Sequence, residues 1–264
     1  KKAKFFKLDI HNEKKINKII EKYNIDSIIH LAANLIIDEG QKNPKKYYKN
    51  NVLGTKKLLS ACKNTSVKNF IFSSTAAIYK EGQYKVSEKS LIKPKSVYGK
   101  TKIKAENLIK NFAKKNKINY GILRYFNIAG SSPSGKIGLI NKSSDHLFKN
   151  FSIELMKKKP KLKIYGTDYK TKDGSCIRDF IHVSDIAEIH YLILEKIDKL
   201  NISKILNCGY NKGTSVLEVA NEFRRQSSKK VDIVYSKRRT NDLIKIIASN
   251  NKLSKFIKWK PKFN

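Results

Sequence analysis

Short apolar runs alternate with longer amphipathic segments over the first half of the chain. Four runs have the length of buried strands: 3–8, 26–31, 69–74 and 119–126. Apolar positions recur at helical spacing in three segments: 12–24, 43–64 and 97–116. Strands that are apolar on both faces, with helices between them, are typical of a parallel sheet covered by helices on both sides. The pattern therefore predicts an α/β fold with a doubly wound parallel sheet.

The pattern changes after Asn127. Residues 128–145 are rich in Gly, Ser, Pro and Lys and show no period, which indicates a long functional loop. Helices are predicted at 147–159, 184–199 and 215–228, and strands at 204–208 and 231–235. We therefore expect a larger domain over 1–127, to which 180–208 returns, and a smaller C-terminal domain over 128–264.

Composition limits the classes of protein to which the chain can belong. Of its 264 residues, 40% are hydrophobic and 10% aromatic, which excludes a disordered chain. No run approaches 18 uncharged apolar residues and no signal peptide opens the chain, which predicts a cytoplasmic protein without a membrane partner. Cys62, Cys176 and Cys208 are too scattered for a disulfide framework or a zinc site, so we expect reduced thiols and no metal.

The strong positive charge raises the question of nucleic-acid binding. With 57 Lys and Arg against 22 Asp and Glu, the formal net charge is +35, but only six of the basic residues are arginines. The lysines are spread along the chain, and arginine is the residue that reads bases by paired hydrogen bonds. An excess of Lys, Ile and Asn together is typical of a genome rich in adenine and thymine. We therefore predict no nucleic-acid partner, and a basic nucleic-acid-binding protein remains the non-enzymatic alternative.

The strongest local signal is the pair Tyr98 and Lys102. Four residues apart in the predicted helix 97–116, they lie on the same face. An ammonium group near a phenol lowers the pKa of the phenol, which makes Tyr98 a competent general base or acid. The preceding predicted strand ends in hydroxyl residues up to Thr75, and ligands of such sheets bind at the carboxyl ends of the strands. Tyr98, Lys102 and Thr75 are therefore predicted to form a proton-transfer site.

Longer motifs extend over nearly the whole chain. They are HLAA at 30–33, YYKNNVLGT at 47–55, FIFSSTAAIY at 70–79, SVYGKTK at 96–102, LRYFNIAGSSPSGKIG at 123–138 and IYGTDYKTKDGSCIRDFIHVSDIA at 164–187. With these motifs the chain resembles the extended short-chain dehydrogenase/reductase family and, within it, the UDP-glucose 4-epimerases. The resemblance implies a Rossmann-like fold and an enzyme that interconverts UDP-glucose and UDP-galactose by transient oxidation at C4, using tightly bound NAD.

The resemblance leaves related activities open. The alternative is another 4-epimerase of the family, acting on UDP-N-acetylglucosamine or UDP-glucuronate. A 4,6-dehydratase is disfavoured, because its chemistry needs an acid pair after the strand-end threonine, where this chain has Ala76 and Ala77. Where this chain has Ile246, some epimerases have a tyrosine that walls the sugar pocket, so the resemblance implies room for an N-acetyl group.

The resemblance also assigns roles to individual residues. The catalytic residues would be Tyr98, Lys102 and Thr75. The cofactor-binding residues would be Asp9, Ile10, Leu31, Ala32, Ala33, Asn50, Asn51, Ser73, Tyr98, Lys102 and Phe126. The substrate-binding residues would be Thr75, Tyr125, Asn127, His146, Leu147, Tyr165, Arg178, Arg239, Asp242 and Ile246. Arg178 and Arg239 suit a diphosphate, because a guanidinium forms paired hydrogen bonds that lysine cannot form.

The family organisation would extend to domains and assembly. Residues 1–127 would bind NAD, and 128–264 would mainly bind the nucleotide sugar. A homodimer would form through the helices at 43–64 and 97–116, with Leu58, Leu59, Ile103 and Leu108 on its apolar stripe.

The chain departs from the family at a few positions. Some members have a lysine at the position of Leu35, and glycine is usual at that of Asn241. The first glycine is Gly40, so the strand and the glycine-rich loop for the NAD pyrophosphate are expected outside these 264 residues. The 264 residues alone are accordingly expected to be inactive.

Overall fold

The computed structural model describes residues 3–140, 146–239 and 242–263. The chain forms two compact units, each assembled from separated segments. Unit 1 consists of Lys1–Ile78, Lys93–Arg124 and His190–Leu206. Unit 2 consists of Tyr79–Ile92, Tyr125–Ile189 and Asn207–Asn264. The functional division between 1–127 and 128–264 stays a prediction.

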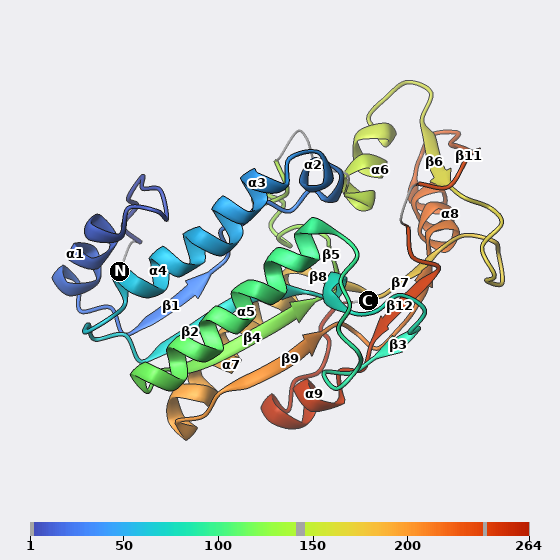
Figure 1. Cartoon of the computed structure of the whole chain (residues 1–264). Coiled ribbons are helices and arrows are strands. Elements are labelled where there is room, and N and C mark those ends of the chain that lie inside the picture. The colour runs from blue at the N-terminus through green and yellow to red at the C-terminus, as the bar shows by residue number, and fades with distance from the viewer. Residues whose placement is uncertain (1–2, 141–145, 240–241, 264) are drawn as a thin grey trace. The chain divides into compact units, whose positions relative to one another are not determined.

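The main sheet has four strands in the order β1-β2-β4-β9 (Figure 1). They are β1 (Ser27–His30), β2 (Asn69–Thr75), β4 (Asn119–Tyr125) and β9 (Lys204–Cys208). β1 and β2 are parallel, with Ile28 opposite Phe70. In Figure 1 the arrows of β1, β4 and β9 point the same way, so the carboxyl ends of these strands share one edge. The predicted α/β fold with a parallel sheet is confirmed.

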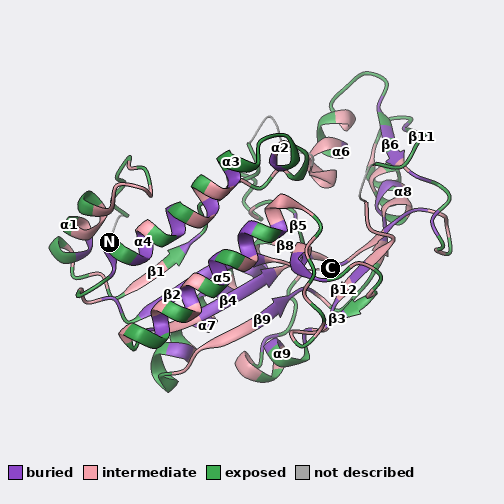
Figure 2. Cartoon of the chain, viewed as in Figure 1, coloured by how far each residue is buried: buried purple, intermediate pink, exposed green. Residues whose placement is uncertain are grey.

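Helices cover both faces of this sheet. In Figure 1, α4 (Thr55–Ala61) and α5 (Val97–Asn116) lie in front of it and α7 (Val183–Leu200) lies behind it. Figure 2 shows β4 buried over most of its length beneath α5. The core under the front helices contains Ile20, Leu58, Leu59, Cys62, Val67, Phe70, Phe72, Ala105, Ile109, Ile118 and Ile122. The apolar face of each helix therefore packs on the sheet, as its spacing predicts.

The helix predicted over 43–64 consists of three consecutive parts. These are α3 (Pro44–Tyr47), the π-helix η1 (Tyr48–Gly54) and α4. π-helical turns contain an additional residue and are frequent at functional sites. This one carries Asn50 and Asn51. The shorter helices of unit 1 are α1 (Glu13–Lys22), α2 (Ile37–Lys42) and the 3₁₀ turn η2 (Ala76–Ile78).

At the start of unit 1, one predicted strand is absent and a second is present but only partly buried. Residues 3–8 form no strand: Phe5 is 88% exposed, and the ring of Phe6 lies 5.6 Å from that of Tyr23. A strand needs a neighbour for its backbone hydrogen bonds, and within the described residues β1 is paired with β2 alone. The strand predicted at 26–31 is present as β1, and among the described residues it lies at an edge of the sheet, where Ile29 is 43% exposed.

Unit 2 contains smaller sheets. One has the order β10-β7-β12-β3, and two parallel pairs are β11 with β6 and β5 with β8. The strands are β3 (Lys85–Val86), β5 (Asn127–Ala129), β6 (Lys161–Tyr165), β7 (Ile177–Arg178), β8 (Phe180–His182), β10 (Thr214–Ser215), β11 (Asp232–Ser236) and β12 (Lys245–Ala248). The helices are α6 (Leu147–Leu155), α8 (Val216–Gln226) and α9 (Asn251–Ile257). α6 and α8 pack on β6 around Phe151 and Leu162.

The helices and strands predicted after Asn127 are confirmed as α6, α7, α8, β9 and β11. The loop predicted from residue 128 begins at residue 130, because Ile128 and Ala129 belong to β5, and residues 130–140 contain neither helix nor strand. Residues 141–145 of that loop, and Asn241, lie outside the described residues. None of the helices in the described part of the chain combines the length and the apolarity needed to cross a bilayer.

Candidate active site

Gly99 brings the beginning of α5 against the end of β2. The hydroxyl oxygen of Ser96 caps this helix by accepting a hydrogen bond from the Gly99 N–H at 3.0 Å. A Cβ at Gly99 would lie 2.5 Å from the carbonyl oxygen of Ala77 and 2.9 Å from Cβ of Pro94. No other residue fits so close to the backbone. The helix carrying Tyr98 therefore begins beside the segment that follows Thr75.

Tyr98, Thr75 and Lys102 are brought together as predicted from their spacing. The hydroxyl of Thr75 lies close enough to the Tyr98 phenol to lower the pKa of that phenol. The Nζ atom of Lys102 lies 5.9 Å from the centroid of the Tyr98 ring and 4.4 Å from that of Phe72. Lys102 is only 2% exposed, so its ammonium group is held among aromatic faces. This arrangement places a hydroxyl, a phenol and an amine side by side.

The pKa of Tyr98 is raised in this structure, although its spacing from Lys102 predicts a lowering. Burial raises the pKa of Tyr98 to about 12, and the nearby hydroxyl of Thr75 acts in the opposite direction. The same burial lowers the pKa of Lys102 to about 7, against the attraction of Glu106. Burial away from water disfavours both the phenolate form of Tyr98 and the ammonium form of Lys102. The positive charge expected to stabilise the phenolate is therefore itself disfavoured by burial.

Asn51 joins the loop after β1 to α5. Its amide nitrogen donates to the carbonyl oxygen of Asn34 at 2.9 Å and to the hydroxyl of Thr101 at 3.1 Å. Its amide oxygen accepts the N–H of Asn34 at 2.8 Å. Asn50 donates to the side chain of Asn34 at 3.2 Å. The π-helix therefore turns two consecutive asparagines toward one loop beside the Tyr98 helix.

The remaining predicted cofactor residues of unit 1 lie on loops and strand ends. Ser73 donates from its hydroxyl to the carbonyl of His30 at 3.2 Å, which ties β2 to β1. Leu31 directly follows β1 and is 60% exposed, and it is followed by the small residues Ala32 and Ala33. This run therefore presents apolar and small side chains to the exterior at the strand edge.

Asp9 and Ile10 contact residues outside the Tyr98 cluster. The Asp9 carboxylate accepts hydrogen bonds from the backbone N–H of His11 at 2.8 Å and pairs with its Nδ1 atom at 2.6 Å. Ile10 packs on Gly54 so closely that a Cβ there would lie 2.4 Å from its Cδ1. Hydrogen bonds from His11 lower the pKa of Asp9. The carboxylate is therefore ionised at neutral pH, and it is 74% exposed.

In unit 2, Arg178 and Asp242 form an ion pair. Nη2 of Arg178 lies 2.5 Å from Oδ1 of Asp242, and their side chains are 11% and 25% exposed. Nη1 of Arg178 also donates to the carbonyl of Ile177 at 2.9 Å. Ile246 lies opposite Arg178 in the register of β12 and β7, and it is 7% exposed. These three predicted substrate residues therefore form one group.

Two further predicted pairs lie in unit 2. The guanidinium of Arg239 lies over the ring of Tyr165, 4.2 Å from its centroid. His146 immediately precedes α6, and its Nε2 atom is hydrogen-bonded to the carbonyl of Ile128. Leu147 begins α6 and packs on the apolar core of this unit. Arg239 is therefore held in a cation–π contact, while His146 ties the helix start to β5.

Tyr125, Phe126 and Asn127 connect β4 to β5. Phe126 is 8% exposed, and its N–H donates to the carbonyl of Cys208 at 3.2 Å. Asn127 donates from its backbone to the carbonyl of Asp179 at 3.0 Å and has an exposed side chain. Tyr125 is half-buried at the end of β4. The predicted residues of unit 1 thus comprise the Tyr98 cluster and, apart from it, Asp9 and Ile10, while those of unit 2 form several smaller groups.

Sequence reasoning missed a buried polar cluster beneath α5. Glu106 is fully buried and forms an ion pair with Arg124, which is 2% exposed. Ser74 donates to the same carboxylate at 2.5 Å. Two signals were present: Glu106 continues the four-residue spacing of Tyr98 and Lys102, and Arg124 is a charge inside an apolar strand. In the described residues, no cluster of three or more His, Cys, Asp or Glu has the arrangement of a metal site.

Comparison with known proteins identifies relatives over nearly the whole chain. The model of the NAD dependent epimerase/dehydratase family matches residues 1–209. A UDP-glucose 4-epimerase from Halalkalibacterium halodurans is 37% identical over 260 residues, which cover 98% of this chain and 78% of that protein.

Solved structures of similar proteins have the same fold. The UDP-glucose-4-epimerase from Stenotrophomonas maltophila, with bound NAD and formylated UDP-arabinopyranose, superposes with a TM-score of 0.94 at 30% identity, covering 98% of this chain and 78% of that one. The UDP-Glc/GlcNAc 4-epimerase from Campylobacter jejuni gives 0.83 at 37% identity, covering 99% and 80%.

Proposed function

The chain belongs to the NAD-dependent epimerase/dehydratase family, and we propose that it interconverts UDP-glucose and UDP-galactose by transient oxidation at C4 with bound NAD. The observation that carries this proposal is the cluster of Thr75, Tyr98 and Lys102. A phenol with a hydroxyl close enough to lower its pKa and an amine beside its ring is suited to proton transfer at a sugar alcohol.

Tyr98 has to act twice in this reaction. It accepts the proton of the 4-hydroxyl from one epimer and returns it to the other, while Thr75 orients that hydroxyl. Because the pKa of Tyr98 is about 12, the phenol needs a nearby positive charge to give up its proton, and Lys102 is the adjacent group that can provide it. The chemistry that NAD supplies when bound is reversible hydride transfer at C4.

The residues assigned to NAD fit such a group. Asp9 has an exposed, ionised carboxylate, which suits the hydroxyl and amino donors of an adenosine. Leu31 is exposed and apolar, and Ala32 and Ala33 leave space for a ligand to approach the backbone. Asn51, hydrogen-bonded to Asn34 and Thr101, holds the loop after β1 in position beside Lys102.

The nucleotide part of the substrate requires its own binding residues, because the hexose must rotate to present its other face during the reaction. We assign binding of the diphosphate to Arg178 and Arg239, whose planar guanidinium groups suit its oxygen atoms. Asp242 holds Arg178 and Tyr165 holds Arg239 before any ligand binds. Such preorganisation reduces the entropy that binding has to overcome.

The test is the conversion of UDP-galactose by the full-length protein and by its Tyr98→Phe variant. Loss of a general acid/base should lower kcat by about 10²–10⁴-fold. Tyr191→Phe is the matched control, since Tyr191 is 60% exposed and bonded to Glu195. Mass spectrometry of the nucleotide released on denaturation should detect NAD. Equal turnover of Tyr98→Phe and the unmodified protein would contradict the proposal.

A second candidate substrate is UDP-N-acetylglucosamine. The observation in its favour is the aliphatic side chain of Ile246 on the same strand pair as Arg178. Isoleucine is smaller than the tyrosine expected from some relatives and leaves room for an acetyl group.

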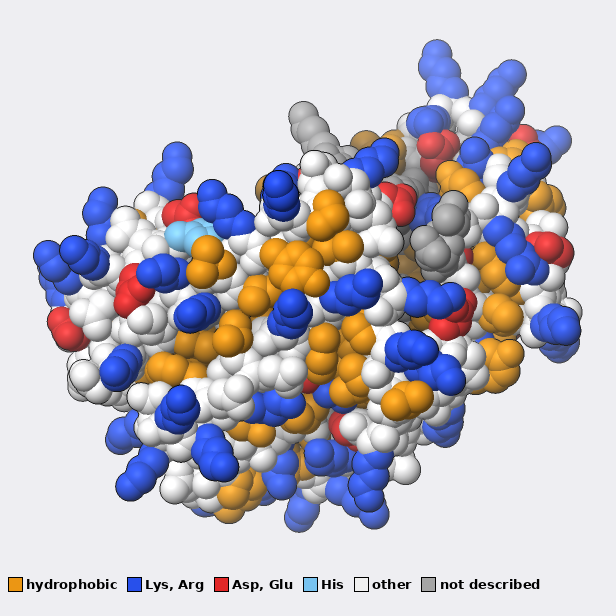
Figure 3. All heavy atoms as spheres, in the orientation of Figure 1, with side chains coloured by type: hydrophobic (Ala, Val, Ile, Leu, Met, Phe, Trp, Pro, Cys, Tyr) orange, Lys and Arg blue, Asp and Glu red, His pale blue; other side chains and the backbone are white. Residues whose placement is uncertain are grey.

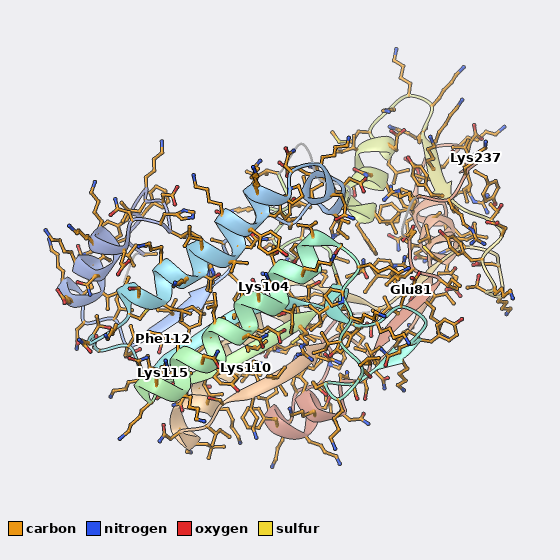
Figure 4. The ribbon with its side chains drawn as sticks, viewed as in Figure 1. Glu81, Lys104, Lys110, Phe112, Lys115 and Lys237 are labelled. Atoms are coloured by element: carbon orange, nitrogen blue, oxygen red, sulfur yellow. The ribbon has the colours of Figure 1, made fainter. Side chains whose placement is uncertain are left out.

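We also propose a homodimer formed by the outer surfaces of η1, α4 and α5. Leu58 and Leu59 are not part of such an interface, because they are 8% and 3% exposed and belong to the core under the helices. Figure 3 shows hydrophobic side chains along the front of these helices, and Figure 4 labels Phe112 there with Lys104 and Lys110. Leu53 is 43% exposed on this surface. Leu53→Lys should shift the mass measured by light scattering from dimer to monomer.

The cytoplasm is the compartment we propose. Cys62, Cys176 and Cys208 are all buried as free thiols, which suits a reducing environment. Two results would together support this assignment. The protein should be recovered in the cytoplasmic fraction, and it should keep its activity only in the presence of a reductant.

A further inference from the structure

Glu106 is the centre of a buried charged cluster that the proposed reaction does not use directly. Its carboxylate is fully buried, and Arg124 and Lys102 are each 2% exposed. Burying charges costs desolvation energy, and a buried ion pair is often replaceable by apolar residues without loss of stability. The presence of three charges here therefore calls for a reason other than stability.

The carboxylate connects three elements. Nη2 of Arg124 lies 2.8 Å from Oε2 of Glu106, and Nε of Arg124 donates to Oε1 at 3.0 Å, so the pair is bidentate. The hydroxyl of Ser74 donates to Oε1 at 2.5 Å. Glu106 belongs to α5, Arg124 to β4 and Ser74 to β2. One side chain therefore ties the helix to two neighbouring strands.

The tie joins the supports of the reacting groups. On α5, Glu106 follows Lys102 by four residues and Tyr98 by eight, so all three lie on one face. On β2, Ser74 directly precedes Thr75. A displacement of α5 along β2 would separate Tyr98 from Thr75, and the hydrogen bonds to Glu106 oppose that displacement. A shift of about 1 Å at such a site can lower a rate about 10²-fold.

We propose that Glu106 is a positioning residue for the epimerisation: it locks α5 against β2 and β4 through Ser74 and Arg124, and its charge keeps the Lys102 ammonium beside Tyr98. This inference rests on the proposed function. The attraction of Glu106 opposes the burial that lowers the pKa of Lys102. The other titratable groups linked to this cluster are Tyr98 of α5, His30 of β1, Tyr47 of α3, and Tyr120 and Arg124 of β4.

The first experiment follows the titration of Lys102 without turnover. Protein labelled with ¹³C-lysine is titrated by NMR, and the Lys102 signal is assigned from a Lys102→Met sample. In Glu106→Gln, which keeps the shape but loses the charge, the midpoint should fall by about one pH unit or more. Glu106→Asp keeps the charge and should restore most of that shift. An unchanged midpoint in Glu106→Gln would overturn the electrostatic part of the proposal.

The second experiment measures kcat and KM for UDP-galactose against pH. Glu106→Gln should lower kcat about 10–100-fold and leave KM within about twofold of the value for the unmodified protein. On the alkaline side of the pH profile, the activity of Glu106→Gln should begin to fall at a lower pH than the activity of the unmodified protein. Glu222→Gln, which removes an exposed carboxylate paired with Arg225, is the control and should match the unmodified protein. Wild-type kcat in folded Glu106→Gln would overturn the positioning role.

Two further outcomes have defined meanings. If Glu106→Gln does not fold, Glu106→Asp tests the positioning role in its place. Its shorter side chain withdraws the carboxylate from Ser74 and Arg124. If folded Glu106→Asp has the same kcat as the unmodified protein, the proposal that the hydrogen bonds of Glu106 to Ser74 and Arg124 position the site is overturned. If the unmodified full-length protein shows no turnover, the proposed function fails, and the NMR titration still tests the link between Glu106 and Lys102.

Discussion

Ile246 of β12 and Arg178 of β7 are opposite residues in a parallel pair of strands. Side chains at paired positions stand on the same face of a sheet, so the aliphatic side chain lies next to the guanidinium. The guanidinium is in turn fixed by Asp242 at 2.5 Å. A change in the size of residue 246 therefore acts beside the cation assigned to the substrate diphosphate.

From this relationship we expect Ile246→Tyr to narrow the range of substrates. The unmodified protein should convert both UDP-glucose and UDP-N-acetylglucosamine. The larger ring should lower kcat/KM for the N-acetylated sugar about tenfold or more and leave UDP-glucose within about threefold. Ile247→Val, at the next position on β12, is the control. Equal effects on kcat/KM for both sugars would contradict a role of residue 246 in substrate specificity.

Arg178→Lys should weaken binding of the nucleotide. Lysine keeps the positive charge but cannot form the planar paired hydrogen bonds of a guanidinium with Asp242 and a diphosphate. Loss of about 1.5–3 kcal/mol of charged hydrogen bonding should lower kcat/KM about 10–100-fold. Isothermal titration with UDP measures the same loss without chemistry. Arg225→Lys, in an exposed pair with Glu222, should have no effect on either measurement.

Gly99→Ala should damage both stability and activity. The added Cβ would lie 2.5 Å from the Ala77 carbonyl oxygen, and backbone has to move to relieve the clash. We expect the free energy of unfolding to fall by roughly 1–3 kcal/mol. Since the movement separates α5 from Thr75, kcat should fall as well. Gly138→Ala, where the nearest atom would be 3.7 Å away, should change stability by less than about 0.5 kcal/mol.

The stability of the protein should depend on pH through His30. Burial lowers the pKa of His30 to about 3, and the nearby charge of Lys102 acts in the same direction. An unfolded histidine has a pKa of about 6.5, so the unfolded chain binds a proton that the folded chain does not. The contribution of neutral His30 is therefore complete above pH 6.5 and declines as the pH falls toward 3.

The measurement is the free energy of unfolding by urea between pH 7 and pH 5. A single proton contributes a slope of up to about 1.4 kcal/mol per pH unit, and His30→Gln should reduce the slope of the unmodified protein by most of that amount. His11 provides the contrast, because hydrogen bonds raise its pKa. His11→Gln should not flatten the curve, and a flatter curve in that variant alone would contradict the assignment to His30.

Local patterns in the sequence were sufficient for the elements that carry the site. The helix predicted at 97–116 is α5 over those same residues, since its apolar spacing and the Ser96 cap are encoded within the segment. The neighbouring positions of Tyr98 and Lys102 follow from helix geometry alone. By contrast, the prediction of a strand at 3–8 was wrong, because the state of such a run depends on whether another strand lies beside it.

The sequence by itself determined the order of helices and strands, the motifs of the family and the residue types available for proton transfer. The tertiary structure decided how these residues affect one another. Glu106, Ser74 and Arg124 are far apart along the chain, and their hydrogen bonds exist only because α5, β2 and β4 pack together. The pKa values of Tyr98 and Lys102 likewise depend on burial, which is a property of the packed chain and not of the four-residue spacing between them.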